Sequence, residues 1–345
     1  MFLENKREEI NNIDANIIEL IIKRRYLSDE IIRFKQLNNL NIYDRDREKF
    51  IIESLKREYS SRLDPIEIEK LFTEILFFSK QDHLKNFSSR ELFNLFKAKP
   101  LLIAGPCTIE SEEQIFKIAE DLAGFGIKYL RGGAFKPRTS PYSFQGLGNE
   151  GLSYMKKAAN KFEMKVVSEI TSIQQLIELN DLLDIIQIGS KNMFAYQLLK
   201  DIGKFNSKEN KPIILKRNFN ATLNEFLHAA DYLRNEGSTN IILCLRGIRT
   251  FEQIDSQLRF TPDLASISEL KKMTELPVIF DPSHATGDSK YIFDITKGAL
   301  ALGADGIMIE THYSPEDALV DSNQTIDYTT LKKIFSFIEQ IRYAL

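Results

Sequence analysis

The chain has 345 residues, of which 43% are hydrophobic and 28% charged, and its formal net charge is −3. This is the composition of an ordinary globular protein with room for about two domains. The near-neutral balance argues against general nucleic-acid binding, and no apolar run approaches the ~18 residues of a membrane span. Two cysteines and no signal-peptide pattern at the N-terminus indicate a reducing cytoplasm rather than a disulfide framework.

The first 87 residues have the pattern of three helices. Apolar residues recur at spacings of three and four, and this predicts one long helix over 4–37. The stripe consists of Ile10, Ile13, Ile17, Leu20, Ile21, Leu27, Ile31 and Phe34. A second helix is expected over 44–59, and a third begins after Asp64-Pro65 and continues to about residue 84. A long helix with one apolar seam cannot bury itself alone, so the segment predicts a helical dimer.

Charged side chains on these helices fall on shared faces. Arg24 and Lys35 are about three helical turns apart and therefore face the same way. Asp44, Arg47 and Glu48 are spaced to share one face of the second helix. A single charged side chain on a helix most often faces solvent and binds nothing. Five charged side chains on shared faces indicate a binding pocket. Arg7 lies well off the Arg24 face and could serve a different pocket.

This segment contains the strings Arg7-Glu-Glu-Ile, Ile17-Ile-Glu-Leu, Arg24-Arg25 and Asp44-Arg-Asp-Arg47-Glu48. Together they resemble the all-helical chorismate mutases. The resemblance implies an intertwined dimer in which Arg7, Arg24 and Arg47 hold the two carboxylates of chorismate. It places Arg24 and Lys35 near the ether oxygen, and Glu48, with Asp44 close by, near the substrate hydroxyl. The rearrangement needs a compressed conformer and well-placed cations, but no nucleophile or metal.

One position departs from the mutase pattern. The family usually has a glutamine late in the third helix, and here that position falls at His83, with Ser79 one turn before it. A histidine can donate the same hydrogen bond, but its charge varies with pH. The alternative function for the segment is a sensor that binds chorismate or prephenate and regulates the second domain.

Residues 88–99 are expected to form a linker between a helical domain at 1–87 and a second domain at 100–345. The second domain contains eight short apolar runs, each followed by a helical stretch. The runs lie at 101–104, 128–132, 165–169, 184–188, 212–216, 240–245, 276–281 and 305–310. The helical stretches lie at 112–124, 150–162, 173–180, 194–201, 222–235, 264–274, 291–302 and 328–343. Continuous apolar runs indicate strands buried on both faces. We therefore predict an α/β fold, a (β/α)8 TIM barrel preceded by a small all-α three-helix domain, with a doubly wound open sheet as the alternative.

A barrel carries its active site at the C-terminal ends of its strands. Polar groups stand at nearly all of these ends: Cys107, Arg131, Lys136, Glu169, Gln187, Lys191, Lys216, Arg217, Arg246, Asp281, His284, Glu310 and His312. The loop that opens at Arg131, RGGAFKPRTSPYSFQGLG, brings together Arg131, Lys136 and Arg138, and suits phosphate. With Lys191, Lys216 and Arg246, these cations predict a site for one or two phosphorylated small molecules.

A second group at the same end has the donors of a metal site. Cys107, His284, Glu310 and Asp321 follow strands one, seven and eight, which become neighbours when a barrel closes. A thiolate, an imidazole and carboxylates fit a first-row transition metal better than Mg²⁺ or Ca²⁺. Cys244, in the middle of the sixth run, is expected to be a core residue.

The barrel segment contains the strings Ile103-Ala-Gly-Pro-Cys107, KPRTS at 136–140, Lys191-Asn-Met, Leu215-Lys-Arg, Arg246-Gly-Ile-Arg-Thr-Phe and Asp281-Pro-Ser-His-Ala-Thr-Gly. Together they resemble the 3-deoxy-D-arabino-heptulosonate 7-phosphate (DAHP) synthases, of the shorter type related to octulosonate 8-phosphate synthases. The resemblance implies that Cys107, His284, Glu310 and Asp321 bind Mn²⁺, Fe²⁺, Co²⁺ or Zn²⁺. It implies phosphoenolpyruvate at Arg131, Lys136, Lys191, Lys216 and Arg246, with Glu169 and Gln187 beside it, and erythrose 4-phosphate at Arg138, Thr139 and Asp281.

Lys136, next to both expected substrates, is the candidate for proton delivery, and burial among cations predicts a lowered pKa for it. Three positions and one segment depart from the family. Lys191 stands where an arginine is usual, Leu245 where a glutamate precedes Arg246, and Asp321 lacks the following glycine. The segment 257–263, before the sixth helix, also departs from the usual pattern. The combined prediction is a cytoplasmic, homo-oligomeric (dimer or tetramer) bifunctional enzyme, with no membrane or nucleic-acid partner. The alternatives are a monofunctional synthase with a sensor domain, an octulosonate-type synthase, or a binding protein that has lost turnover.

Overall fold

The computed structural model describes residues 2–37, 45–79, 96, 100–136, 142–251 and 260–341. Contacts divide the chain into two compact units, Met1–Phe87 and Ser88–Leu345. None of the helices in the described ranges is long and apolar enough to cross a bilayer.

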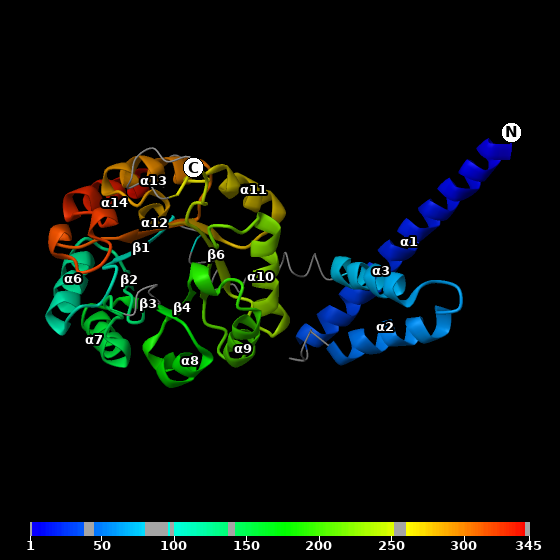
Figure 1. Cartoon of the computed structure of the whole chain (residues 1–345), viewed down its shortest axis with the longest axis horizontal. Helices are drawn as coiled ribbons and strands as arrows, with labels where there is room; N and C mark the ends of the chain where they lie inside the picture. Colours follow the sequence, from blue (N-terminus) through cyan, green and yellow to red (C-terminus); the bar gives the residue numbers. More distant parts are fainter. Residues whose placement is uncertain are drawn as a thin grey trace. The chain divides into compact units, whose positions relative to one another are not determined.

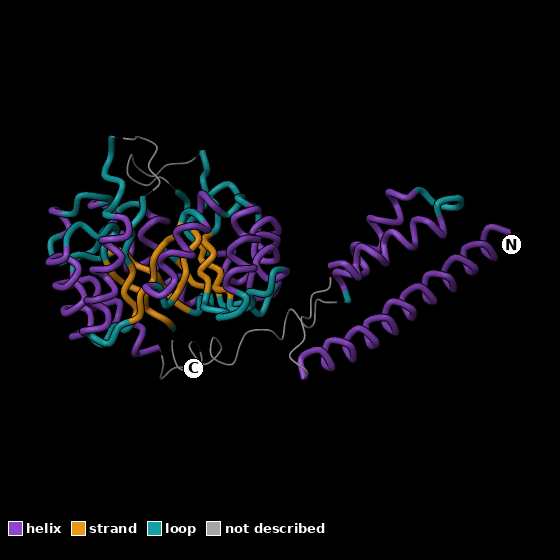
Figure 2. The backbone as a smooth tube through the Cα atoms, turned by 90° about the horizontal axis from the view of Figure 1, so that it is seen from below, coloured by secondary structure: helices purple, strands orange, loops and turns teal. Residues whose placement is uncertain are grey.

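The helical unit contains α1 (Phe2–Leu37), α2 (Arg45–Tyr59) and α3 (Pro65–Phe78). Figure 2 shows α1 as one uninterrupted helix, as its apolar stripe predicts. At the start of α3, the Asp64 carboxylate accepts a hydrogen bond of 2.7 Å from the Ile66 N–H. This bond satisfies one of the backbone donors that a helix leaves unpaired at its first turn. α3 ends at Phe78, earlier than expected, and residues 80–84 lie outside the described ranges.

This unit has little apolar core within one chain. Among its described residues, the buried apolar side chains are Ile32, Ile68 and Leu76. In contrast, α1 leaves a long series of large apolar side chains about half exposed or more: Ile10, Ile13, Ile17, Ile18, Leu20, Ile22, Tyr26, Leu27, Ile31 and Phe34. An ion pair between Lys56 and Glu69 links α2 to α3.

The second unit is a closed barrel of eight parallel strands, paired in chain order, with the last strand against the first (Figure 1). The strands are β1 (Leu101–Gly105), β2 (Tyr129–Arg131), β3 (Lys165–Ile170), β4 (Ile185–Ile188), β5 (Ile213–Lys216), β6 (Ile241–Leu245), β7 (Val278–Phe280) and β8 (Gly306–Glu310). Each strand falls within, or within one residue of, an apolar run predicted from the sequence. The predicted fold class is confirmed.

Helices surround the strands on the outside, and the short helix α12 (Pro282–Thr286) lies inside this ring (Figures 1 and 2). The outer helices are α6 (Glu112–Gly124), α7 (Gly148–Lys161), α8 (Ile173–Leu179), α9 (Tyr196–Asn206), α10 (Leu223–Asn235), α11 (Ala265–Met273), α13 (Ile292–Ala301) and α14 (Tyr328–Ile341). All but α12 match predicted stretches. Local capping agrees with these bounds: Thr222 and Glu225 form a reciprocal capping box at the start of α10.

Apolar side chains alternate between two layers of the barrel. On β1, Leu102 and Ala104 pack outward under the helices, whereas Leu101 and Ile103 join a cluster inside the barrel. Cys244 belongs to this inner cluster and is fully buried, as expected for a core cysteine. Phe96, from the segment expected to be a linker, packs against the same cluster. The filled interior leaves the strand ends as the place for chemistry.

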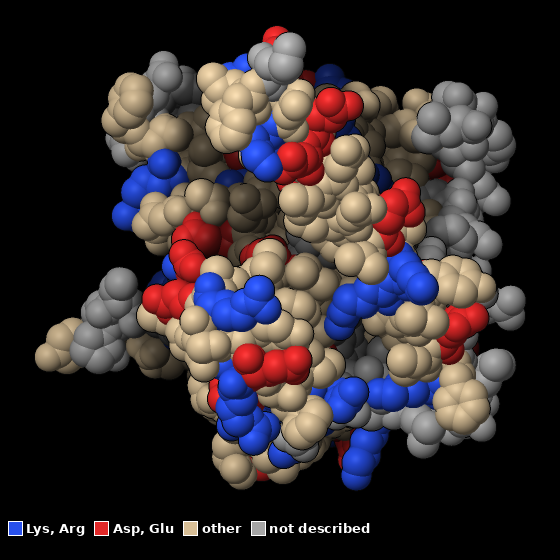
Figure 3. Space-filling model, turned by 90° about the vertical axis from the view of Figure 1, so that its right-hand side faces the viewer, with Lys and Arg blue, Asp and Glu red and all other residues tan. Residues whose placement is uncertain are grey.

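Charge is mixed on the molecular surface. On the face drawn in Figure 3, Lys and Arg side chains are interspersed with Asp and Glu and with uncharged residues. This pattern accords with the small net charge of −3.

Candidate active site

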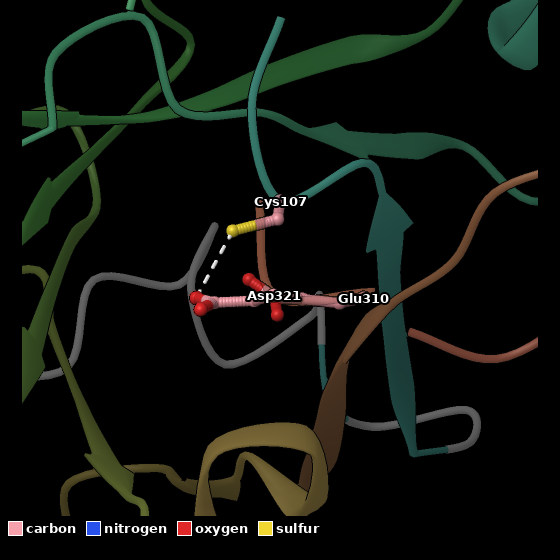
Figure 4. A group of neighbouring side chains, drawn as sticks. All are labelled: Cys107, Glu310 and Asp321. Atoms are coloured by element: carbon pink, nitrogen blue, oxygen red, sulfur yellow. Dashed lines mark hydrogen bonds between the residues drawn. The ribbon is translucent and has the colours of Figure 1, made fainter. Parts of the chain in front are cut away.

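Three candidate metal ligands meet where β1 and β8 end. Cys107 follows β1, Glu310 is the last residue of β8, and Asp321 lies in the loop before α14. One ligand atom from each lies within 4.8 Å of the other two, and Figure 4 shows the three side chains converging. The Cys107 Sγ is 3.4 Å from the Asp321 Oδ2. Cys107 and Glu310 lie close together because β1 pairs with β8, with Gly105 of β1 in register with Glu310 of β8.

His284, the fourth expected ligand, is held by a short helix that the sequence did not predict. Asp281 caps α12, its Oδ1 accepting from the His284 N–H at 2.9 Å, while its Oδ2 lies 2.8 Å from the His284 Nδ1. The other ring nitrogen, Nε2, is 3.6 Å from the Glu310 Oε1. A carboxylate on one imidazole nitrogen fixes the ring so that the other nitrogen faces the site. Burial lowers the pKa of His284, which favours the neutral, ligating form.

The Glu310 carboxylate joins this cluster to the cations. Its Oε1 accepts from an Arg131 guanidinium N–H at 2.9 Å, and its Oε2 accepts from the Gln324 amide at 2.5 Å. Burial alone would raise the pKa of Glu310, but His284 and Arg131 outweigh it and lower the pKa to about 2. The carboxylate is therefore ionised at neutral pH. Gln324 was missed from the sequence, where an uncharged amide in a loop carries no signal.

Lys136 lies against the thiol. Its Nζ donates to the Cys107 Sγ at 3.1 Å. A side chain at Gly133 would collide with Lys136, since an added Cβ would lie 2.5 Å from the Lys136 Cε. The expected lowering of the Lys136 pKa is wrong. Burial does act in that direction, but Cys107 and Glu310 outweigh it and raise the pKa, so Lys136 is an ammonium at neutral pH.

The donor set fits a first-row transition metal. Burial raises the pKa of the Cys107 thiol to about 12, and the neighbouring Glu310 charge adds to this effect. A coordinated metal ion deprotonates such a thiol outright. One sulfur, one imidazole nitrogen and two carboxylates are the ligand types that Mn²⁺, Fe²⁺, Co²⁺ or Zn²⁺ accept. Asp321 reaches its place with a left-handed backbone (φ 55°), a conformation that aspartate tolerates better than most residues.

Buried cations line the neighbouring strand ends. Arg131 ends β2, Lys216 ends β5 and Arg246 follows β6, and all three are less than a tenth exposed. Lys216 forms an ion pair with Asp281, and its Nζ lies 3.5 Å from the His284 Nδ1. Arg246 donates to the His284 carbonyl at 3.1 Å. Asp281 thus contacts both His284 and Lys216, and these two groups together hold its pKa well below the usual range despite burial.

The remaining residues expected to bind substrate are not all buried beside these cations. Gln187 on β4 donates to Glu169 on β3 at 3.1 Å, and Gly189 leaves room for that carboxylate, since an added Cβ would lie 2.0 Å from the Glu169 Oε1. Lys191 is exposed in the turn that follows β4. Arg138 and Thr139 lie outside the described residues.

In the helical unit, α1 and the end of α3 meet at Arg24. Its guanidinium donates to the hydroxyl of Ser79, which is 3% exposed. Burial lowers the pKa of Arg24, an effect that Glu48 on α2 partly offsets. Lys35 is half-buried, whereas Arg7 and Arg47 are exposed. Asp44 and His83 lie outside the described residues.

Two family models match the chain. The model of the DAHP synthetase I family matches residues 96–345, and that of chorismate mutase type II matches residues 6–83. A phospho-2-dehydro-3-deoxyheptonate aldolase of Thermotoga maritima is 43% identical over 244 residues, which are 71% of this chain and 70% of that protein. A 2-dehydro-3-deoxyphosphooctonate aldolase of Francisella tularensis is 25% identical over 268 residues, covering 72% and 94% of the two chains.

Two solved structures are similar to this chain. The crystal structure of the Thermotoga maritima DAHP synthase matches with a TM-score of 0.67 and 42% identity, over 72% of this chain and 70% of that one. A truncated form of that synthase gives a TM-score of 0.65 at 40% identity, over 72% and 88% of the two chains. The second unit of the chain is a closed barrel of eight parallel strands, and its buried cations, thiol, imidazole and carboxylates lie at the strand ends. This fold and this position of the site are those of the (β/α)8-barrel enzymes. The chain belongs to the DAHP synthetase I family. It also carries a chorismate mutase type II domain, and so combines a transferase and an isomerase of aromatic amino acid biosynthesis.

Proposed function

We propose that the barrel condenses phosphoenolpyruvate with erythrose 4-phosphate to DAHP and phosphate, and that the helical unit converts chorismate to prephenate. The contact between Arg131 and Glu310 carries the first proposal. It joins a cation suited to phosphate directly to a carboxylate suited to a metal, at 2.9 Å. Two such groups in contact match a reaction that joins a phosphorylated enol to an aldehyde.

In this proposal Cys107, His284, Glu310 and Asp321 hold a divalent metal, which supplies a Lewis acid for the aldehyde oxygen of erythrose 4-phosphate. Asp281 orients His284 and Lys216, because its carboxylate contacts both. We keep Arg138 and Thr139 as candidates for the erythrose 4-phosphate phosphate group.

The cations Arg131, Lys216 and Arg246, with Lys191, bind phosphoenolpyruvate and counter its negative charge. C3 of the enol forms the new C–C bond with the aldehyde carbon. The Lys136 ammonium delivers a proton to the oxygen that becomes an alkoxide, a role that its raised pKa supports. Water adds to C2 and loses one proton, which restores the Lys136 ammonium. The C2–O bond to phosphate then breaks as C2 becomes a carbonyl, and inorganic phosphate leaves with the other proton.

For the helical unit, the Arg24–Ser79 contact and the nearby Glu48 support a pocket among α1, α2 and α3. Arg7 is 17 residues from Arg24 on the same helix, or about 25 Å at 1.5 Å per residue. It therefore cannot serve the same pocket within one chain. The exposed apolar side chains of α1 support a dimer in which the partner's Arg7 completes each pocket.

The test is to measure two reactions on the purified full chain. Phosphate release from phosphoenolpyruvate should require erythrose 4-phosphate, stop after chelation and return with Mn²⁺. Arabinose 5-phosphate should not replace erythrose 4-phosphate, and if it did, an octulosonate-type enzyme would be indicated. Chorismate absorbance should fall without any metal. If chorismate persisted but inhibited phosphate release, the helical unit would be a sensor and the mutase proposal would be wrong.

A further inference from the structure

Two aromatic rings lie against Arg246, one of the buried cations. Phe219 follows β5, and Phe260 precedes α11. The Arg246 guanidinium carbon lies 4.3 Å from the centre of the Phe260 ring and 5.8 Å from that of the Phe219 ring. The two rings contact each other, with centroids 5.3 Å apart and planes inclined at 39°.

Backbone contacts hold the two rings in place. The Arg249 N–H donates to the Phe219 carbonyl at 2.9 Å, and its guanidinium carbon lies 4.5 Å from the centre of the Phe219 ring. Beside Phe260, Ile248 and Thr261 exchange backbone hydrogen bonds of 3.0 and 2.9 Å. These contacts connect the loops after β5 and β6 with the segment before α11.

A second set of contacts anchors these loops to the barrel. Buried Arg217 donates to the Asp263 carboxylate at 2.9 Å, to the Ser266 hydroxyl at 3.1 Å and to the Ala221 carbonyl. These bonds join the end of β5 to the start of α11. These bonds fix the backbone positions from which Phe219 and Phe260 reach Arg246.

Stacking has a definite effect on a guanidinium. All five N–H donors lie in the plane of the group, so a ring over its face leaves the donors at the edge available. Contact with an aromatic face also attracts the cation, more strongly where water is excluded. A guanidinium held in this way presents its donors in one orientation, as a phosphate oxygen pair requires.

We propose that Phe219 and Phe260 are positioning residues that orient Arg246 for the phosphate of phosphoenolpyruvate. This inference rests on the proposed function of the barrel. The two rings do not touch the reacting atoms and act only through Arg246.

The test compares Phe260→Leu, Phe260→Tyr and a matched control, Phe293→Leu, in the full chain. Phe293 is a suitable control because it packs on the Phe337 ring and lies 4.8 Å from the Lys297 ammonium, on the outer helix α13. We expect Phe260→Leu to raise the KM for phosphoenolpyruvate at least tenfold with kcat changed less than threefold. Phe260→Tyr keeps the ring and should stay within threefold of wild type, as should Phe293→Leu.

Calorimetric titration of phosphoenolpyruvate, without erythrose 4-phosphate, separates this inference from the proposed reaction. A loss of affinity in Phe260→Leu alone, parallel to the rise in KM, supports the inference. Equal affinity in Phe260→Leu and Phe293→Leu would overturn it and leave the rings as ordinary packing. Wild-type protein that bound no phosphoenolpyruvate would overturn the proposed function and the inference together.

Discussion

Glu310 connects the two halves of the candidate active site through its two carboxylate oxygens. One oxygen is taken by Arg131 and the other by Gln324, and both contacts are buried. A substitution here would therefore disturb the metal ligands and a substrate cation at once. Cys107 is the better residue to change, because its thiol contacts Lys136 and Asp321 and its substitution leaves the Arg131–Glu310 contact in place.

We expect Cys107→Ser to lower metal affinity at least tenfold, about 1.4 kcal/mol, because a hydroxyl is a poor replacement for a thiolate. Titration with Co²⁺ checks this directly, since a coordinated thiolate gives a charge-transfer band that serine cannot. Cys244→Ser is the matched control, a buried thiol inside the barrel. The band should survive in Cys244→Ser, and its survival in Cys107→Ser would contradict the ligand assignment.

Asp184 offers a pH-dependent prediction away from the site. Just before β4, its Oδ2 accepts from the Lys156 ammonium at 2.8 Å and from the Val166 N–H at 2.9 Å. Although burial opposes it, the contact with Lys156 lowers the pKa of Asp184 below its usual 3.8. A carboxylate with a lowered folded-state pKa stabilises the fold above the unfolded pKa and loses that effect as pH falls.

Asp184→Asn should therefore reduce the free energy of unfolding by about 1 kcal/mol at pH 7. The difference from wild type should begin to shrink as pH falls below about 4, where the carboxylate of the unfolded chain takes up a proton, and should disappear below the folded-state pKa. Urea unfolding at pH 7 and pH 3 checks it. A difference of the same size at both pH values would show that the charge contributes nothing.

Residue types could be assigned to the site from the sequence, but their electrostatics could not. Cys107, His284 and Glu310 are predicted ligands because reactive donors at strand ends stand out in a barrel, and Asp321 is predicted from the loop that follows the last strand. The sign of the Lys136 pKa shift was missed because the groups that decide it, the Cys107 side chain and the Glu310 carboxylate, follow or end other strands of the barrel. Gln324 was missed because its contact with Glu310 depends on the folded position of its amide, which the sequence does not reveal.

At the scale of elements, the strands were predictable because both of their faces are buried, which makes them continuous apolar runs. α12 was not, because a five-residue helix has no periodicity to detect. It forms because Asp281 accepts from the His284 N–H and Pro282 starts the first turn. The helix that orients His284 is thus specified by its cap.

The exposed apolar face of α1 carries a prediction of its own. Ile13→Asp should weaken self-association at least tenfold, because it places a charge among side chains that the dimer would bury. Asn16→Asp, which adds the same charge at a polar position of α1, is the control and should associate normally. Sedimentation velocity over a range of concentrations measures both, and unaltered association of Ile13→Asp would exclude α1 from the interface.

At the scale of the whole molecule, the chain consists of two compact units, and the large apolar core belongs to the barrel unit. Two units of such different cores predict two thermal transitions. Mn²⁺ at one hundred times its Kd should stabilise the barrel by about 2.7 kcal/mol and raise its transition by roughly 5–10 °C. The transition of the helical unit should not move. Scanning calorimetry before and after chelation tests this, and a single transition, or two that shift together, would contradict it.

The pairing of β1 with β8 has a consequence for how the chain is made. β1 is synthesised about 200 residues before its partner β8, so at about 5–20 residues per second it waits roughly 10–40 s on the ribosome. Cys107 leaves the ribosome early, whereas Glu310 and Asp321 arrive last. The candidate metal site therefore assembles only when the barrel closes, and a translation product that stops before Glu310 has neither a closed barrel nor a complete site.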